Sequence, residues 1–374
     1  MKKLFLSAAF LAASLASQAQ QAPLWMRYPA ISPDGKTIVF SYKGDIYSVP
    51  ATGGEARQLT TNAAHDSYPI WSPDGKKIAF ASNREGSFDV YVMSAHGGAP
   101  TRITTNSERE IPVAFKDNDH VLFSANIMPT AESNLFASRE FSQVYEVSTQ
   151  GGRPKLYSVI PMEDISINAK GQVLYHDSKG YEDQWRKHHT SPITRDIWML
   201  DNGKYQKITA FKGEDRTPVW AADGESFYYL SEQAGSFNIY HRNIATSKDV
   251  QLTHEKKNPI RFLTSSADGL LCYGYDGEIY TVKEGAQPQK VNISITADND
   301  EPSLVRQVRS WGATEIALSP DAKEVAFVMH GDVYVTSTEY KTTKRITDTP
   351  QQERNVSFSP DGRSLVYASE RNGV

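Results

Sequence analysis

A four-residue turn motif recurs along this chain, and its spacing restricts the fold more than any other feature of the sequence. Ser-Pro-Asp-Gly occurs at 32–35, 72–75 and 359–362, and related sequences occur at 221–224, 266–269 and 319–322. Proline presets φ at the second turn position, aspartate bonds to the nearby backbone, and glycine tolerates the exit geometry. Short apolar runs flank the copies. Each copy therefore predicts a tight turn between two β-strands.

A second marker, Asp-Ile-Tyr or a close variant, recurs in phase with the turns. Its copies lie at 45–47, 89–91, 144–145, 196–198, 239–240, 279–280 and 332–334. A Gly-Gly pair often follows, and then a short run that ends in Leu-Thr or Ile-Thr, as at Leu59-Thr60 and Ile346-Thr347. Each unit thus holds four short strands, which we label A to D. Four strands in about 40 residues are typical of a β-propeller blade.

The marker spacing divides the chain into domains. Three intervals between marker aromatics are 44, 42 and 40 residues, and three are 53 or 54. The extra residues of the last interval are the polar, turn-rich stretch 295–312, which is typical of a linker. Six units precede it and one and a half follow it. The predicted fold class is all-β: a six-bladed β-propeller of four-stranded antiparallel blades over 23–294, the linker, and the truncated start of a second β-propeller over 313–374.

Two units carry insertions between strands B and C, at about 125–142 and 176–195. Strand direction alternates, so we expect both insertions on the same face of neighbouring blades. They are interpreted either as solvated loops that pack on each other or as a docking surface or channel rim. The candidate rim or docking residues are Arg139, Trp185, Arg186, Lys187, His188 and Arg195.

The first residues resemble an export signal. Lys2 and Lys3 precede the apolar run 4–15, which is too short to span a bilayer, and small residues at Ser17 and Ala19 predict cleavage after Ala19. We therefore expect residues 1–19 to be a signal peptide and the protein to be exported, either periplasmic or secreted. No later segment is apolar enough for a membrane span. The net charge of −4, without a basic stripe, argues against nucleic acid as a partner.

Catalytic motifs are missing from the sequence. It holds no G-x-S-x-G, no H-E-x-x-H and no P-loop. Asp117-Asn118-Asp119 lacks the glycine and the distal glutamate of a calcium loop, and we interpret it as an A–B turn. Cys272 is the single cysteine and is expected to pack in the core. We predict no catalytic, cofactor-binding or metal-binding residue in this chain.

The order of signal peptide, Ser-Pro-Asp-Gly repeats, six blades, linker and second propeller resembles the tricorn protease family. The stretch 185–198, Trp-Arg-Lys-His-His-Thr-Ser-Pro-Ile-Thr-Arg-Asp-Ile-Trp, is similar to a segment of that family's six-bladed propeller. The resemblance implies an exported serine peptidase whose catalytic core follows two propellers, and a six-bladed ring near the product exit. It also implies a pair of adjacent arginines that holds a substrate carboxylate. This chain has no Arg-Arg dipeptide, and Arg139 is a partial match only.

Two other functions stay open at this point. One is a non-enzymatic, TolB-like periplasmic propeller that binds proteins, although a TolB-like chain would place an α/β domain before the blades. The other is a prolyl-oligopeptidase-type enzyme, which would have one propeller only. The expected partners are peptides and downstream domains of the same polypeptide. The sequence leaves the assembly state open, including a homo-oligomer.

Overall fold

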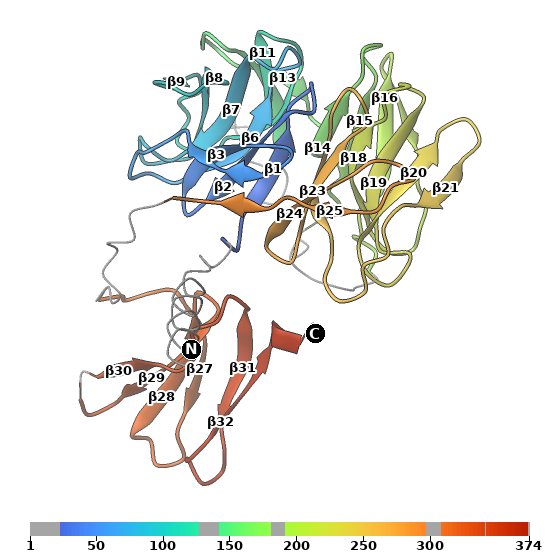
Figure 1. Ribbon diagram of the computed structural model, residues 1–374. Helices are drawn as coiled ribbons and strands as arrows, with labels where there is room; N and C mark the ends of the chain where they lie inside the picture. Colours follow the sequence, from blue (N-terminus) through green and yellow to red (C-terminus); the bar gives the residue numbers. More distant parts are fainter. Residues whose placement is uncertain (1–22, 127–141, 181–190, 297–307, 341, 373–374) are drawn as a thin grey trace, which may run out of the picture. The chain divides into compact units, whose positions relative to one another are not determined.

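The computed structural model describes residues 23–126, 142–180, 191–296, 308–340 and 342–372. The chain divides into two compact units, Met1–Thr296 and Ala297–Val374. The described part of the first unit forms six four-stranded antiparallel sheets, each in the order A-B-C-D, as the sequence predicted. Figure 1 shows them as successive blades coloured from blue to orange.

The strands of each blade follow one another along the chain. Blades 1 to 3 consist of β1 (Arg27–Ile31), β2 (Thr37–Tyr42), β3 (Asp45–Pro50), β5 (Arg57–Gln58), β6 (Asp66–Trp71), β7 (Lys77–Ser82), β8 (Asp89–Ser94), β9 (Thr101–Arg102), β10 (Ile111–Phe115), β11 (His120–Ala125), β12 (Gln143–Ser148) and β13 (Lys155–Ser158). Blades 4 to 6 consist of β14 (Met162–Ile167), β15 (Val173–Asp177), β16 (Ile197–Asp201), β17 (Lys204–Lys207), β18 (Asp215–Trp220), β19 (Ser226–Ser231), β20 (Asn238–Asn243), β21 (Lys248–Gln251), β22 (Arg261–Ser265), β23 (Leu271–Tyr275), β24 (Glu278–Val282) and β25 (Gln289–Lys290).

The A–B turns have the chemistry that their sequence predicted. In blade 1 the Ser32 hydroxyl donates to Asp34 Oδ1 at 2.6 Å and accepts from the Thr37 backbone N–H. Gly35 has φ +72°, which a glycine adopts without strain. The same serine–aspartate bond recurs in blade 2, between Ser72 and Asp74, and in the second unit. Asp117-Asn118-Asp119 lies between β10 and β11, so it is an A–B turn as well.

The Asp-Ile-Tyr and Leu-Thr markers are two halves of one structure. In blade 1 the Thr60 hydroxyl accepts from the Ile46 backbone N–H at 2.9 Å and donates to Asp45 Oδ1 at 3.0 Å. The end of strand D is thereby fixed to the start of strand C. The same pair of bonds joins Thr253 to blade 5 and Thr347 to the four-stranded sheet of the second unit. We call the first residue of this marker, Asp45 in blade 1, the marker position.

One backbone hydrogen bond recurs between neighbouring blades. The N–H at the start of strand A donates to the carbonyl of the residue just before the marker position of the preceding blade. The pairs, at 2.7 to 3.1 Å, are Asp66 to Gly44, Glu110 to Phe88, Asp215 to Arg195, Ile260 to Phe237 and Met26 to Gly277. The last pair joins blade 1 to blade 6. The ring is therefore closed by the same bond that joins its internal blades.

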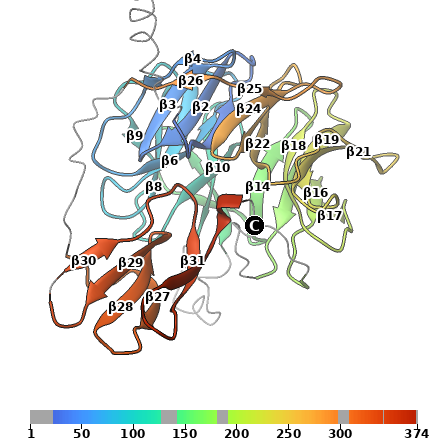
Figure 2. The ribbon, with the colours of Figure 1, turned by 60° about the horizontal axis from the view of Figure 1, so that its bottom comes forward.

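A short parallel strand pair reinforces this closure. β26 (Ile293–Ser294) pairs with β4 (Gly54–Glu55), and Figure 2 shows the two strands side by side. The Gly54 N–H donates to the Asn292 carbonyl at 2.8 Å. Around this joint, core residues of blade 1 such as Phe40 pack with Ile279 and Cys272 of blade 6. Burial raises the pKa of the Cys272 thiol, which packs as a small apolar side chain, as expected.

The second unit has one four-stranded and one two-stranded sheet in its described part. Its strands are β27 (Ala313–Leu318), β28 (Glu324–Met329), β29 (Asp332–Ser337), β30 (Thr343–Arg345), β31 (Glu353–Phe358) and β32 (Leu365–Ser369), followed by a short 3-10 helix, Glu370–Asn372. Its buried core is small and centres on Ala326, Val328, Val333 and Val356. The side chains of Ile316 and Leu318 are 75% and 60% exposed. Its sheets resemble the blades of the first unit.

Candidate functional site

The six A strands surround the axis of the ring. Each packs against the A strand of the next blade, from β1 through β6, β10, β14 and β18 to β22 and back to β1. Five A strands carry a residue with left-handed backbone near their start: Tyr28, Tyr68, Asp164, Thr217 and Phe262, with φ between +49° and +60°. The register shifts at these positions, which is typical of a β-bulge. Neighbouring residues of this set contact each other near the ring axis, Tyr28 with Tyr68 and Phe262, and Thr217 with Asp164; we call the set the channel layer.

One sector of this layer is aromatic. Tyr28 of blade 1 packs between Tyr68 of blade 2, in a tilted contact with 4.0 Å between ring centroids, and Phe262 of blade 6, in an edge-to-face contact at 4.7 Å. Arg109, an exposed residue of the loop before β10, places its guanidinium over the Tyr68 and Phe88 rings. Burial and the neighbouring Tyr68 raise the pKa of Tyr28, so its phenol stays neutral.

Two donors converge on the hydroxyl of Tyr68. Tyr28 Oη donates to Tyr68 Oη at 3.0 Å, and an Arg109 N–H donates to the same oxygen at 3.0 Å. Since both lone pairs of that oxygen are then used, the Tyr68 O–H points elsewhere as a donor. This sector therefore offers stacking surfaces together with hydrogen-bond donors.

The sector formed by blades 4 and 5 is ionic. Thr217 Oγ1 donates to Asp164 Oδ2 at 2.6 Å, so the bulge residues of the two blades are bonded to each other. Behind them, Arg195 pairs with Glu163 at 3.3 Å and with Glu214 at 3.4 Å. The Arg195 side chain is 8% exposed and the Glu214 side chain is fully buried. Glu214 also pairs with Arg216, and this buried part of the ion network fixes the geometry of the wall.

His176 completes the ionic wall. Its Nδ1 accepts from the Thr217 backbone N–H at 3.2 Å, so Nε2 carries the proton and donates to Glu163 Oε2 at 3.0 Å. Burial alone would raise the pKa of Glu163. The hydrogen bond from His176 and the positive charge of Arg195 outweigh burial and lower that pKa to about 2. Glu163 is therefore a carboxylate at neutral pH.

The structure describes one of the six candidate rim residues. Arg195 lies just before the marker residue of blade 4, on the face of the B–C connections, with its charge turned inward to Glu163 and Glu214. Arg139, Trp185, Arg186, Lys187 and His188 lie outside the described residues, as do the central parts of both insertions. Whether these residues form a rim stays a prediction.

Sequence reasoning missed the other members of both walls. Glu163, His176 and Glu214 come from three separate strand ends, and Tyr28, Tyr68 and Phe262 come from three blades. Their position in the repeat could have indicated the bulge residues, because each of them lies near the start of a strand A. Among the described residues, no group of three His, Cys, Asp or Glu side chains is arranged to hold a metal ion. In the same part of the chain, no helix is long and apolar enough to cross a membrane.

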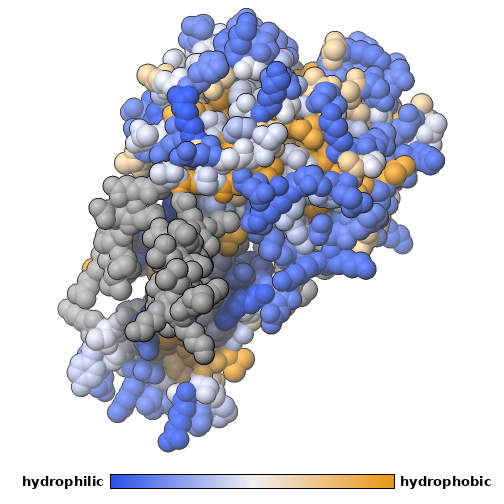
Figure 3. Space-filling model, viewed as in Figure 1, coloured by the Kyte–Doolittle hydropathy of each residue, from blue (hydrophilic) through white to orange (hydrophobic). Residues whose placement is uncertain are grey.

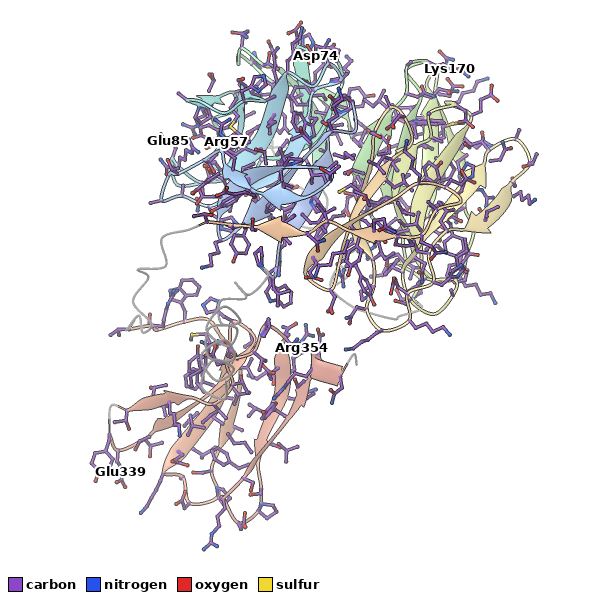
Figure 4. The ribbon with its side chains drawn as sticks, in the orientation of Figure 1. Arg57, Asp74, Glu85, Lys170, Glu339 and Arg354 are labelled. Atoms are coloured by element: carbon purple, nitrogen blue, oxygen red, sulfur yellow. The ribbon has the colours of Figure 1, made fainter. Side chains whose placement is uncertain are left out.

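The exterior of the first unit is polar. Hydrophilic residues dominate its visible face in Figure 3. In Figure 4, Asp74 and Lys170 mark A–B turns of blades 2 and 4, while Glu85 marks the B–C connection of blade 2. Glu85 and Asp74 lie at opposite ends of β7, and thus on opposite faces of the ring. The ionic wall lies toward the B–C face.

Six four-stranded blades, closed around a channel lined by their A strands, define a β-propeller. The family model of the tricorn protease N-terminal beta propeller domain matches residues 23–288. The chain belongs to this family, which confirms the resemblance found in the sequence. A comparison with curated proteins finds no match.

Several solved structures are similar to this chain, and the first of them shows the fold. The crystal structure of the tricorn protease is similar with a TM-score of 0.61 and 18% identity, over 89% of this chain and 32% of that chain. The chain thus spans about a third of the length of that protein. TolB from Acinetobacter baumannii matches at 12% identity and a TM-score of 0.45, over 92% of this chain and 79% of its own. A prolyl endopeptidase matches at 13% identity and a TM-score of 0.45, over 98% of this chain and 58% of its own.

Proposed function

We propose that this chain is the N-terminal propeller region of an exported, tricorn-like serine peptidase, and that its ring gates peptides and docks downstream domains. In this proposal residues 1–19 are a signal peptide, 23–294 the ring, 295–312 a linker and 313–374 the first part of a second propeller. The catalytic serine and its base belong to a part of the protein outside this chain. Family membership over 23–288 is the observation that carries the proposal.

The chemistry of the channel layer supports a gating role. A peptide that passes through the ring meets aromatic rings and Arg109 on one side and Asp164 with its ionic support on the other. Aromatic surfaces stack on apolar side chains, while the charged groups select against unpaired like charges. Such a lining discriminates among peptides without any catalytic group of its own.

The gating role is tested in the full-length gene product with Tyr68→Ala and Arg109→Ala. If peptides pass the aromatic sector, both variants change the turnover of long peptides and leave that of a dipeptide-sized chromogenic substrate unchanged. Lys170→Ala, at an exposed turn of blade 4, is the matched control. Equal effects on long and short substrates, or a full-length protein without peptidase activity, contradict the proposal.

Two simpler measurements test the rest of it. N-terminal sequencing of the exported protein should start at Gln20 if cleavage follows Ala19. The chain by itself should not react with serine-hydrolase probes, because we place the nucleophile outside it. Stoichiometric labelling of one serine in residues 20–374 overturns that assignment.

A further inference from the structure

The junctions between blades follow a rule that links two positions. We call the residue two places before the bulge of strand A the junction position. Its N–H makes the inter-blade bond at the five junctions named above. An acid occupies it only where the preceding blade has Asp at the marker position. The acidic pairs are Asp45 with Asp66, Asp89 with Glu110, Asp196 with Asp215 and, in the second unit, Asp332 with Glu353. After Gln143, Asn238 and Glu278 the junction residue is apolar: Met162, Ile260 and Met26.

The pair between blades 2 and 3 is fully enclosed. Asp89 and Glu110 are both 0% exposed. The Glu110 N–H bonds to the Phe88 carbonyl at 2.7 Å, which brings the two buried carboxyl groups to the same junction, and neither Asp89 Oδ1 nor Glu110 Oε1 has a hydrogen-bond partner among the described residues. Two ionised carboxylates have only acceptors, so a hydrogen bond between the two groups needs a proton on one of them.

The charges around this pair do not replace that proton. Arg102 of β9 forms an ion pair with Asp89 at 2.9 Å, which balances one carboxylate only. Glu110 faces the Asn106 backbone N–H, which donates to its Oε2 at 3.2 Å, and the Thr104 hydroxyl. Glu85, on the B–C connection, adds a further negative charge near Asp89. Burial raises the pKa of Glu110 most. The hydrogen bonds from Thr104 and Asn106 lower it in part, and the neighbouring Asp89 raises it further. The resulting pKa is about 7.

The junction between blades 4 and 5 also buries a carboxyl group, that of Asp215. Asp215 is 1% exposed, and the Ser231 and Thr209 hydroxyls lie close to it without a hydrogen bond of ordinary geometry. Asp196 pairs with Lys207 at 2.8 Å and with Lys179, so the nearby cations are engaged by Asp196. Burial, with the charges of Asp196 and Asp249, raises the pKa of Asp215 to about 7.

We infer that the blade 2–3 and blade 4–5 junctions each hold one proton on a buried carboxyl group, so that loss of these protons above neutral pH loosens the ring. A group whose pKa is higher in the folded than in the unfolded state stabilises the fold below its unfolded pKa of about 4.5 and loses that contribution as pH rises through about 7. The inference goes beyond the proposed gating role and does not depend on it.

Neutral amides test this inference because they resemble protonated carboxyls. Denaturant unfolding of residues 20–374 is measured from pH 5 to pH 8 for the wild type, Glu110→Gln, Asp215→Asn and the exposed neighbour control Glu108→Gln. Relative to wild type, each junction variant should gain about 100-fold in folding equilibrium constant between pH 5 and pH 8, whereas the control gains nothing. Variants that lose the same stability at both pH values contradict the inference.

A spectroscopic measurement on the wild type keeps the inference testable if a variant does not fold. At pH 6 most exposed carboxylates are ionised, so the infrared stretch of protonated buried carboxyl groups should remain visible and disappear reversibly as pH rises above neutral. Glu110→Gln should remove part of that signal, and Asp215→Asn another part. A folded wild-type protein without any protonated carboxyl signal at pH 6 overturns the inference.

Discussion

The backbone of Gly53 touches the backbone of Asn292, which lies at the opposite end of the ring's sequence. A Cβ atom on Gly53 would be 2.6 Å from the Asn292 carbonyl oxygen. This contact sits beside the β26–β4 pair, and thus at the closure of the ring. The glycine is required here by the approach of another strand as well as by its own φ of +88°.

The first prediction concerns this closure. Gly53→Ala should lower the free energy of unfolding by about 1–3 kcal/mol more than Gly97→Ala. Gly97 is the equivalent residue of blade 2 and has a similar φ of +82°, but its added Cβ would make only ordinary contacts, 3.5 Å or longer. Both variants have the same backbone strain, so the difference measured by chemical denaturation isolates the contact with Asn292. Equal losses would show that the strand pair is dispensable.

The second prediction concerns the bond between strands C and D. Thr60→Val keeps the shape of the side chain but removes the acceptor of the Ile46 N–H and the donor to Asp45. Because Thr60 is 4% exposed, the loss should cost about 1–3 kcal/mol of unfolding free energy. Thr61→Val, at the exposed neighbouring residue, should change stability by less than about 0.5 kcal/mol. Thermal unfolding of both variants decides the question.

The third prediction concerns the ionic wall. Arg195→Leu removes one partner from each acid but leaves Glu163 with His176 and Glu214 with Arg216, so the variant should lose about 1–3 kcal/mol at pH 7. A carboxyl with a lowered pKa stabilises the fold above its unfolded pKa of about 4.5, and that stability is lost as pH falls toward about 2. The difference between variant and wild type should therefore shrink in acid. An unfolding series from pH 7 to pH 3, with exposed Arg153→Leu as control, measures it.

The fourth prediction concerns the two units. The closed ring covers both faces of each blade, whereas strand β27 of the second unit exposes Ile316 and Leu318. Limited proteolysis should therefore degrade the second unit first and leave a resistant fragment that ends before Ala313. Mass spectrometry of the early products gives the cleavage sites. Equal resistance of the two units would show that the second is stable by itself.

The repeat chemistry made the blades predictable from the sequence. Serine, aspartate and glycine bond locally in the A–B turn, so residues such as Ser32 and Asp34 make the same contacts wherever the motif occurs. The order of strands and the six-bladed ring followed from counting those turns. Local chemistry of this kind needs no knowledge of distant contacts.

The channel walls were not predictable in the same way. Glu163 and His176 meet because they are opposite each other on the paired strands β14 and β15, and Arg195 joins them from the residues just before β16. Neither the left-handed residue nor the hydrogen bond from the Thr217 backbone to His176 has a sequence signature. Burial of Glu214 and Arg195 also contradicts the usual exposure of charged residues, so it depends on their mutual pairing.

The junction rule has a consequence for how such a ring changes during evolution. Asp89 belongs to one repeat, but Glu110, which lies at the same junction, is the first residue of the next repeat. A mutation that replaces one of the two leaves a buried carboxyl without its companion, and the compensating mutation must occur in a neighbouring copy. Repeats of this chain therefore do not diverge independently. Related sequences should show paired replacement of residues about 20 positions apart. A blade transplanted by itself should fit only beside a neighbour of the same junction type.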